Sequence, residues 1–172
     1  MEASVAPPPV RRIVVGIDGS EPAAAALATS VGLARSLGAE IVAVHAIPPP
    51  ALSEYRYGML PVELDPAWRA EVRRQLEEEW CRPLEEAGVP YRTVERDGRP
   101  ATVIREVADE EEADLVVVGR RGRGRVVELL LGSVSHELSH TCQRPLLLIP
   151  TPHRDEREPR PGRNAREVSH DR

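Results

Sequence analysis

The chain has 172 residues, 28 acidic and 23 basic, which gives a net charge of −5 and enough length for one domain with a substantial core. All 23 basic residues are arginines. The lack of lysine excludes Schiff-base enzymes, Walker-type phosphate loops and the ATP-binding lysine of kinases. The acidic balance and an aromatic content of 3% argue against nucleic acid as a partner, because nucleic-acid surfaces use basic patches and stacking.

The cellular compartment is predicted from what the sequence lacks. Two cysteines, Cys81 and Cys142, do not make a disulfide framework. The first residues lack the apolar core of a signal peptide, and no apolar run approaches the roughly 20 residues of a membrane span. We therefore expect a cytoplasmic protein with no membrane partner.

The first part of the chain predicts two buried strands separated by a helix. The β-branched run at 12–17 predicts the first strand, and the run at 40–46 predicts the second. Between them a helix is expected at 21–37, with Ser20 as its N-cap and Gly38 at its end. The apolar face of this helix is assigned to Leu27, Val31, Ala34 and Leu37.

A long loop is expected at 51–64, followed by a helix at 66–87 that Pro83 should kink or break. The strand at 89–96 is more polar, which is typical of a sheet edge. The remaining elements are a helix at 100–112, a strand at 115–118, a helix at 134–142 and a strand at 146–149. This alternation predicts an α/β fold with one open parallel sheet and helices on both faces, in three layers.

The two ends of the chain show no apolar periodicity. Residues 1–10 are a proline-rich lead, and residues 151–172 interleave arginine with acidic residues, proline and glycine. We predict that both ends are disordered and that residues 11–150 form the single folded domain.

A spaced set of glycines follows the strand at 115–118. Gly119 and Gly122 come first, and after nine further residues Gly132 and Ser133 open the last helix. A glycine turn exposes backbone N–H groups, and a helix N-terminus adds more of them with a positive dipole end. Together with the Ser133 hydroxyl, these groups predict a phosphate cradle that needs no lysine.

Asp18 ends the first strand at the same edge of the sheet, where open α/β sheets bind their ligands. A carboxylate in that place accepts hydrogen bonds from ribose hydroxyls or from an amine. The alternative is that the glycines only form turns and that Asp18 only helps to cap the following helix. The two strand ends together favour a nucleotide pocket.

At these residues the sequence resembles the universal stress protein family. The spacing from Gly119 to Ser133 matches the family's ATP-binding signature G-x2-G-x9-G-[S/T], and the resemblance covers about 12–150, including the blocks IVVGIDGS and LLLGSVSHEL. It implies the family's five-stranded parallel sheet in the order 3-2-1-4-5, an adenine nucleotide alpha-hydrolase-like fold. It also implies homodimers that form through the last strand, here Leu146 to Ile149.

The resemblance further implies bound ATP, often with Mg or Mn on the phosphates. Asp18 would contact adenosine, and Ile17 and Ala46 would line the adenine pocket. The ribose and phosphates would be held by Gly119, Gly122, Gly132, Ser133 and Val134.

The glycine loop departs from the family pattern in its charge. Arg120 and Arg121 stand between the first two glycines, where members often have small residues or histidine, and Arg123 follows. These arginines either contact phosphates or form a solvated basic loop.

We expect an ATP-binding universal stress protein that acts as a nucleotide-dependent sensor or regulator of the stress response with little or no turnover. No catalytic residue is assigned, because the sequence shows no positioned general base and no catalytic lysine. The alternatives are a slow ATPase or phosphotransferase, and a non-enzymatic interaction protein without bound nucleotide.

Three histidines, His136, His140 and His45, are candidate ligands. His136 to His140 reads H-E-x-x-H, the zinc protease pattern, which requires both imidazoles to face a dry cleft. The inward face of this helix is assigned to Val134, Leu138, Thr141 and Cys142. Both histidines should therefore point outward, where the exposed pair can still pick up Zn or Ni adventitiously, and no metal site is assigned. His45, at a strand end, is interpreted as a packed histidine.

Overall fold

The computed structural model describes residues 9–49, 65–120 and 131–150. The strands are β1 (Arg12–Gly16), β2 (Glu40–Ile47), β3 (Tyr91–Asp97), β4 (Leu115–Gly119) and β5 (Leu146–Ile149). The helices are α1 (Glu21–Leu37), α3 (Pro66–Arg74), the π-helical segment η2 (Gln75–Trp80), α4 (Arg82–Glu86), α5 (Pro100–Glu110) and α6 (Ser133–Thr141). Predictions for 51–64 and for 151–172 lie outside these residues, as does most of the predicted lead at 1–10.

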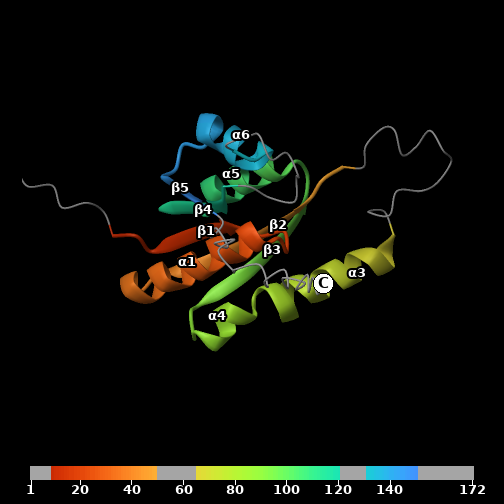
Figure 1. The fold of residues 1–172 in the computed structure, drawn as a ribbon, viewed down its shortest axis with the longest axis horizontal. Helices are drawn as coiled ribbons and strands as arrows, with labels where there is room; N and C mark the ends of the chain where they lie inside the picture. Colours follow the sequence, from red (N-terminus) through yellow and green to blue (C-terminus); the bar gives the residue numbers. More distant parts are fainter. Residues whose placement is uncertain (1–8, 50–64, 121–130, 151–172) are drawn as a thin grey trace, which may run out of the picture.

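All strand pairs are parallel, and the sheet order is β3-β2-β1-β4-β5. Figure 1 shows helices on both sides of this sheet. The predicted fold class, a three-layer α/β domain with strand order 3-2-1-4-5, is confirmed. The polar strand β3 is an edge strand, as its composition predicted. Within the described ranges, no helix is long and apolar enough to cross a membrane.

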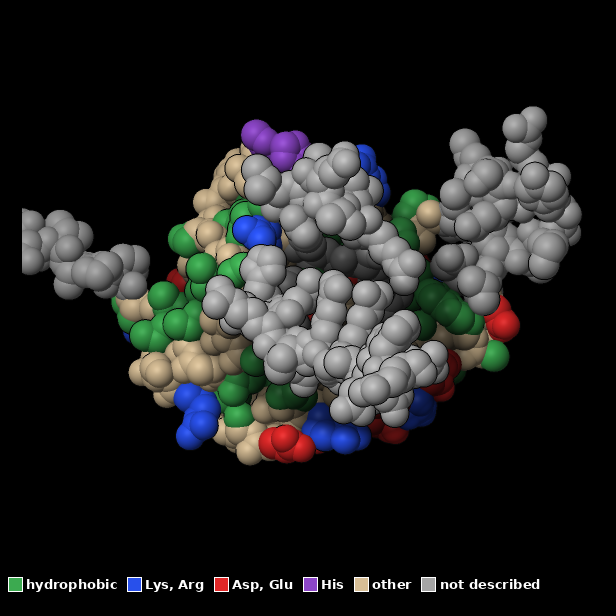
Figure 2. Space-filling view, in the orientation of Figure 1, with side chains coloured by type: hydrophobic (Ala, Val, Ile, Leu, Met, Phe, Trp, Pro, Cys, Tyr) green, Lys and Arg blue, Asp and Glu red, His purple; other side chains and the backbone are tan. Residues whose placement is uncertain are grey.

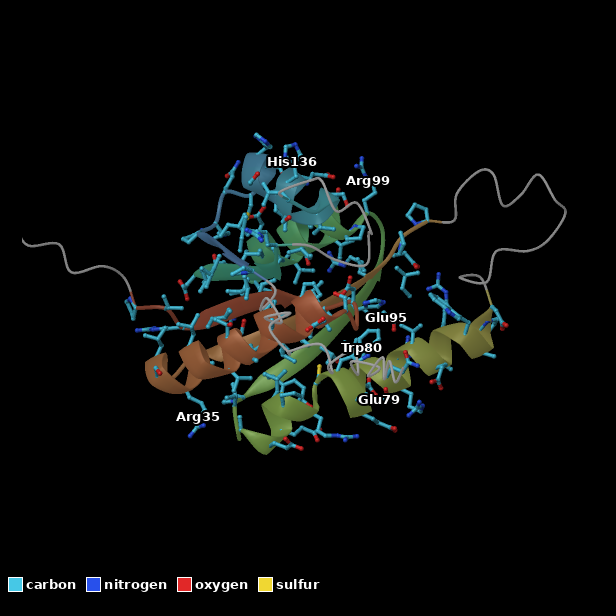
Figure 3. The ribbon with its side chains drawn as sticks, viewed as in Figure 1. Arg35, Glu79, Trp80, Glu95, Arg99 and His136 are labelled. Atoms are coloured by element: carbon cyan, nitrogen blue, oxygen red, sulfur yellow. The ribbon has the colours of Figure 1, made fainter. Side chains whose placement is uncertain are left out.

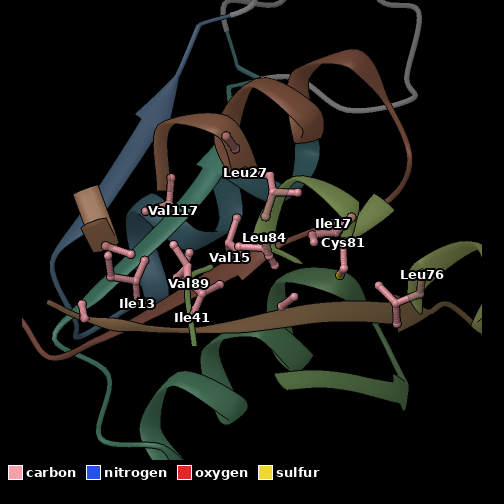
Figure 4. Close-up of a cluster of buried hydrophobic side chains, with 14 residues drawn as sticks. Ile13, Val15, Ile17, Leu27, Ile41, Leu76, Cys81, Leu84, Val89 and Val117 are labelled. Carbon is pink, nitrogen blue, oxygen red and sulfur yellow. The ribbon is translucent and has the colours of Figure 1, made fainter. Parts of the chain in front are cut away.

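Alternate residues of the strands face two separate hydrophobic clusters, because side chains of a strand point to opposite sides of a sheet. Ile13 and Val15 pack with Leu27 of α1 and with the η2–α4 segment, as Figure 4 shows. Val14 faces the other cluster, which includes side chains of α5 and α6. Burial on both faces explains why the central strands are continuous apolar runs.

The helix predicted at 66–87 is divided into α3, η2 and α4. Pro83 lies in the first turn of α4, where its missing N–H group costs no hydrogen bond. Just before it, the Cys81 N–H donates to the carbonyl of Leu76 at 3.1 Å, five residues back, which is the π-helical pattern. The predicted break is therefore confirmed, and it falls at Cys81.

One residue assigned to the inward face of α1 is exposed. The buried residues of this helix include Leu27, Ser30 and Ala34, a row that continues to Gly38 one turn later. Leu37 lies seven residues after the buried Ser30, on the same side of the helix, but it is 51% exposed. The assignment of Leu37 to the core was wrong because the burial of this face stops at Ala34, one turn before the helix ends.

Asp114 joins the starts of β1 and β4. Its Oδ2 accepts hydrogen bonds from the backbone N–H groups of Arg11 and Arg12 at 2.7 and 2.9 Å. Its own N–H donates to the Arg12 carbonyl at 3.0 Å. The N–H of Arg11, followed by that of Arg12, stabilises the charged carboxylate and lowers the pKa of Asp114 against a smaller opposing effect of burial.

Gly119 lies where β4 passes under the first turn of α1. A Cβ atom there would be 2.7 Å from the backbone carbon and oxygen of Pro22. Backbone atoms in a helix cannot move aside cheaply, so the packing of α1 on β4 itself requires a glycine at this position.

We predict that Asp114→Ala lowers the free energy of unfolding by about 1–2 kcal/mol at pH 7, because two backbone donors lose a charged acceptor. The folded pKa of Asp114 lies below its unfolded value of about 3.9, so this stabilisation exists above that pH and is lost as the pH falls through the folded pKa. Urea unfolding from pH 7 to about 3 measures the difference. Asp114→Asn, which keeps an acceptor without the charge, is the control, and a difference independent of pH would contradict the prediction.

We predict that Gly119→Ala lowers the free energy of unfolding by about 1–3 kcal/mol through overpacking against Pro22. The matched control is Gly32→Ala within α1, where an added Cβ has no neighbour within 4 Å. This control should stabilise the protein by about 0.5–1 kcal/mol, because alanine favours a helix. Equal effects of the two substitutions in urea unfolding would refute the close approach at Gly119.

Candidate functional site

The loop between β1 and α1 is folded around Asp18. Asp18 Oδ1 accepts hydrogen bonds from the N–H of Ser20 at 3.0 Å and from its hydroxyl at 2.5 Å. Ser20 Oγ in turn accepts from the N–H of Ala23 at 3.3 Å, which confirms Ser20 as the N-cap of α1. Among the described residues, no donor reaches Oδ2 of Asp18, so one carboxylate oxygen is left to accept from a ligand.

The side chains of Trp80 and His45 pack against the loop between β1 and α1. Gly19 has a φ of +74°, and a Cβ there would lie 2.6 Å from the ring of Trp80. His45 makes an edge contact with Trp80 at a centroid distance of 5.2 Å, and its Nδ1 lies 2.8 Å from the carbonyl oxygen of Ile17. A carbonyl can only accept, so Nδ1 carries a proton and donates it.

His45 is thus a buried, packed histidine, as interpreted from the sequence. Its role in holding the Ile17 carbonyl next to Asp18 was missed. The available signal was a polar residue inside the apolar run of β2, close to the carboxyl end of that strand.

The end of β4 and the start of α6 are joined through the backbone of Arg120. Its N–H donates to the carbonyl of Ile149 at 2.7 Å, and its own carbonyl accepts from the N–H of Gly132 at 2.8 Å and from Ser135 Oγ at 2.7 Å. These bonds bring Gly119 close to Gly132 although 12 residues separate them in the sequence. The structure therefore places the two described parts of the glycine signature together.

The N-terminus of α6 offers N–H donors at this place that no described residue accepts. Gly132 is the N-cap with an extended backbone, and no side chain caps the helix. The first bond of the helix runs from the N–H of His136 to the carbonyl of Gly132 at 2.9 Å. The N–H groups of Ser133, Val134 and Ser135 precede it and have no acceptor within the helix.

Arg120 supplies a further donor. Its Nε is buried and has no hydrogen-bond partner among the described residues, although a buried donor left unsatisfied is costly. The other two arginines considered for phosphate contact, Arg121 and Arg123, lie outside the described residues, as does Gly122.

Ile17 and Ala46, the apolar residues assigned to the adenine pocket, lie at the ends of neighbouring strands but face opposite sides of the sheet. Ile17 is buried in the cluster on the α1 side of the sheet, whereas Ala46 is buried in the cluster on the α5 side. Val134 packs its side chain against this second cluster, so only its backbone remains for a ligand. The structure thus does not bring the side chains of Ile17 and Ala46 onto one surface.

A second buried group without a partner lies on β3. Glu95 accepts a hydrogen bond from Arg73 of α3 at 3.1 Å through Oε1, whereas its Oε2 is buried and meets no donor in the part of the chain that the structure describes. In the register of the sheet Glu95 stands beside His45, and Figure 3 labels it near Trp80. Sequence reasoning did not single out Glu95, because a charged residue on an edge strand is ordinarily solvated.

His136 and His140 are exposed on α6, as predicted, and Figure 2 shows histidine side chains standing at the surface there. The buried residues of α6 are Ser135 and Leu138, a row that continues to the partly buried Cys142. Thr141 lies seven residues after the partly buried Val134 but is exposed, so its assignment to the inward face was wrong; in this last turn of α6 the packing continues only at Cys142. The H-E-x-x-H pattern therefore faces no cleft, and the described ranges hold no cluster of three or more metal-ligating side chains.

Comparison with known proteins identifies the family. The sequence profile of the universal stress protein family matches residues 9–150. The universal stress protein YxiE of Bacillus subtilis is 32% identical over 145 residues, which are 80% of this chain and 97% of that protein.

Solved structures of similar fold include the hypothetical protein MJ0577, with a TM-score of 0.72 and 23% identity over 83% of this chain and 97% of that one. A universal stress protein in complex with cAMP has a TM-score of 0.56 and 24% identity, over 84% of this chain and 99% of that one. The universal stress protein of Archaeoglobus fulgidus in complex with dAMP has a TM-score of 0.61 and 19% identity, over 83% and 99%. On the family profile and the curated relative, this chain belongs to the universal stress protein family.

Proposed function

We propose that this chain binds ATP at the carboxyl edge of its sheet and acts in the cytoplasm as a nucleotide-dependent sensor or regulator with little or no turnover. The observation that carries the proposal is the pair of bonds that the Arg120 carbonyl accepts from Gly132 and Ser135, which sets the N-terminus of α6 against the end of β4. Two structures of similar fold were solved with the adenine nucleotides cAMP and dAMP, which supports the nucleotide class.

The phosphates would lie at the N-terminus of α6. Backbone N–H groups and the hydroxyl of Ser133 would donate to phosphate oxygens, since a helix N-terminus is an anion site. The buried Nε of Arg120 would gain the partner it lacks. Gly119 and Gly132 would keep side chains out of the cradle, and the same role is proposed for Gly122. Contacts of Arg121 and Arg123 with phosphate also remain part of the proposal.

The nucleoside would lie toward β1 and β2. Asp18 Oδ2 would accept from a ribose hydroxyl or an adenine amine, while Oδ1 keeps the loop in shape through Ser20. Ala46 would line the adenine pocket with its side chain, and Ile17 with its backbone. A Mg²⁺ or Mn²⁺ ion would be bound by phosphate oxygens and water, which is how magnesium is held beside nucleotides.

Little turnover is expected from this set of groups. The chain has no lysine, and no described residue is arranged as a base for an attacking water at α6. Asp18 is already committed through Oδ1 to its own loop. A slow ATPase remains the alternative, and steady production of ADP that Asp18→Ala abolishes would favour it.

We also propose a homodimer that forms through β5. Pro145 and Ile149 direct their carbonyl groups toward β4, so the N–H and C=O groups of the alternate residues Leu146 and Leu148 point away from the sheet. The side chains of β5 are only partly buried. An unpaired, aliphatic edge strand is a template for a second strand, which favours pairing with another copy.

We predict that Asp18→Asn weakens ATP binding at least about tenfold, because the amide nitrogen replaces the free acceptor oxygen while Oδ1 still accepts from Ser20. Calorimetry measures the affinity, and the free energy of unfolding should change by less than about 0.5 kcal/mol. Gly132→Val, at a backbone conformation that any residue adopts, should abolish binding without unfolding the protein. If denatured wild-type protein releases no adenine nucleotide and added ATP gives no thermal shift, the nucleotide site does not exist.

We predict that Leu148→Pro converts the dimer to a monomer, because proline removes one outward N–H group from the edge of β5 without breaking the bonds to β4. Sedimentation equilibrium should give twice the mass of the chain for the wild type and the mass of one chain for the variant. Leu148→Ala, which shortens the side chain but keeps the N–H group, is the control and should remain a dimer. A dimeric Leu148→Pro protein would place the interface elsewhere.

A further inference from the structure

The exposed face of α6 carries two imidazoles one helical turn apart. His136 and His140 both stand in solvent, and their ring centroids lie 4.8 Å apart with an angle of 73° between the planes. Residues four apart on a helix are neighbours on the same side of its surface. The two rings therefore already lie next to each other without any change in the backbone.

The distance between the rings is compatible with a shared metal ion as well as with an ordinary edge contact between rings. With metal–nitrogen bonds of about 2.1 Å and a ring nitrogen about 1.2 Å from its centroid, two imidazoles that meet at about 90–110° have centroids about 4.6–5.4 Å apart. The observed 4.8 Å lies within this range. Rotation of the exposed side chains about χ1 and χ2 then suffices to aim one nitrogen of each ring at the same point.

The backbone under the two histidines is firmly held. The N–H of His136 donates to Gly132, and the carbonyl of His136 accepts from the hydroxyl of Ser139 at 2.6 Å. Glu137, which stands between the histidines in the sequence, forms an ion pair at 3.0 Å with Arg99, the N-cap residue of α5. This ion pair balances the charge of Arg99, and Figure 3 shows Arg99 and His136 on the same side of the molecule.

We propose that His136 and His140 form a two-imidazole site for one divalent transition-metal ion on the outer face of α6. Neutral imidazole is a preferred ligand of Zn²⁺, Ni²⁺ and Cu²⁺, and the affinity for such a site rises toward Cu²⁺. Two protein ligands leave the other coordination positions of the ion to water, so the bound ion exchanges readily with ions in solution. The site is separate from the proposed nucleotide cradle and does not depend on it.

The experiment is a calorimetric titration of the full, tag-free chain with NiCl₂ in a buffer that does not bind metal. The expected result is one ion per chain, with the affinity reduced at least about tenfold in His136→Ala and in His140→Ala, because each variant loses the chelate. The sequence also contains His153 and His170. The double variant His153→Ala/His170→Ala should bind Ni²⁺ as the wild type does.

A spacing variant separates chelation from histidine content. His140→Ala/Thr141→His keeps two exposed histidines on α6 but sets them five residues apart, about 140° around the helix, so it should bind no better than His136→Ala. Circular dichroism checks that each variant is folded. Wild-type affinity in the spacing variant, or loss of binding in the His153→Ala/His170→Ala protein, would overturn the proposal.

Discussion

The backbone of Arg120 is the junction on which the rest of the carboxyl edge depends. The N–H group of Arg120 donates to the carbonyl of Ile149 in β5. The carbonyl of Arg120 accepts hydrogen bonds from the N–H group of Gly132, the N-cap of α6, and from the hydroxyl of Ser135. Three elements therefore meet at a single residue at the end of β4. Because a helix keeps its axis once its first turn is held, these bonds also orient the rest of α6, including the face that carries its histidines.

At the carboxyl ends of β1 and β2, the edge of the sheet is held by polar and aromatic contacts rather than by aliphatic packing. β1 and β2 are buried on both faces, so polar groups appear only where these strands end. There Asp18 folds its own loop through Ser20, and His45 fixes the Ile17 carbonyl beneath it. Trp80, from η2 on the far side of the loop, leaves room only for a glycine at position 19. The loop is preorganised by the protein before any ligand binds.

Local patterns predicted the fold because each one has a local physical cause. The β-branched runs, the Ser20 cap and the position of Pro83 all act within one turn or strand, and all three appear in the structure. The errors at Leu37 and Thr141 both fall in the last turn of a helix, where a face drawn from periodicity extends past the place where packing stops. The end of a helix is decided by its neighbours, so periodicity alone does not identify it.

The site was only partly predictable for a related reason. Glycine spacing indicated that Gly119 and Gly132 act together, and the backbone of Arg120 brings them together. The buried, unpaired Nε of Arg120 and Oε2 of Glu95 depend on what surrounds each side chain in three dimensions, which no sequence spacing encodes.

Gly119 shows how packing and binding can require the same residue. A side chain at position 119 would clash with the backbone of Pro22. The glycine is therefore required by packing, and its place in the nucleotide-binding signature is not in itself proof of a ligand. Asp18 is different, because one oxygen is used by the fold while the other has no described donor. A carboxylate that is only half used by its own loop and a helix N-terminus whose first N–H groups meet no acceptor among the described residues both follow strands of the same parallel sheet. The two together have the polarity of a nucleotide site, with an acceptor for a nucleoside and donors for phosphates.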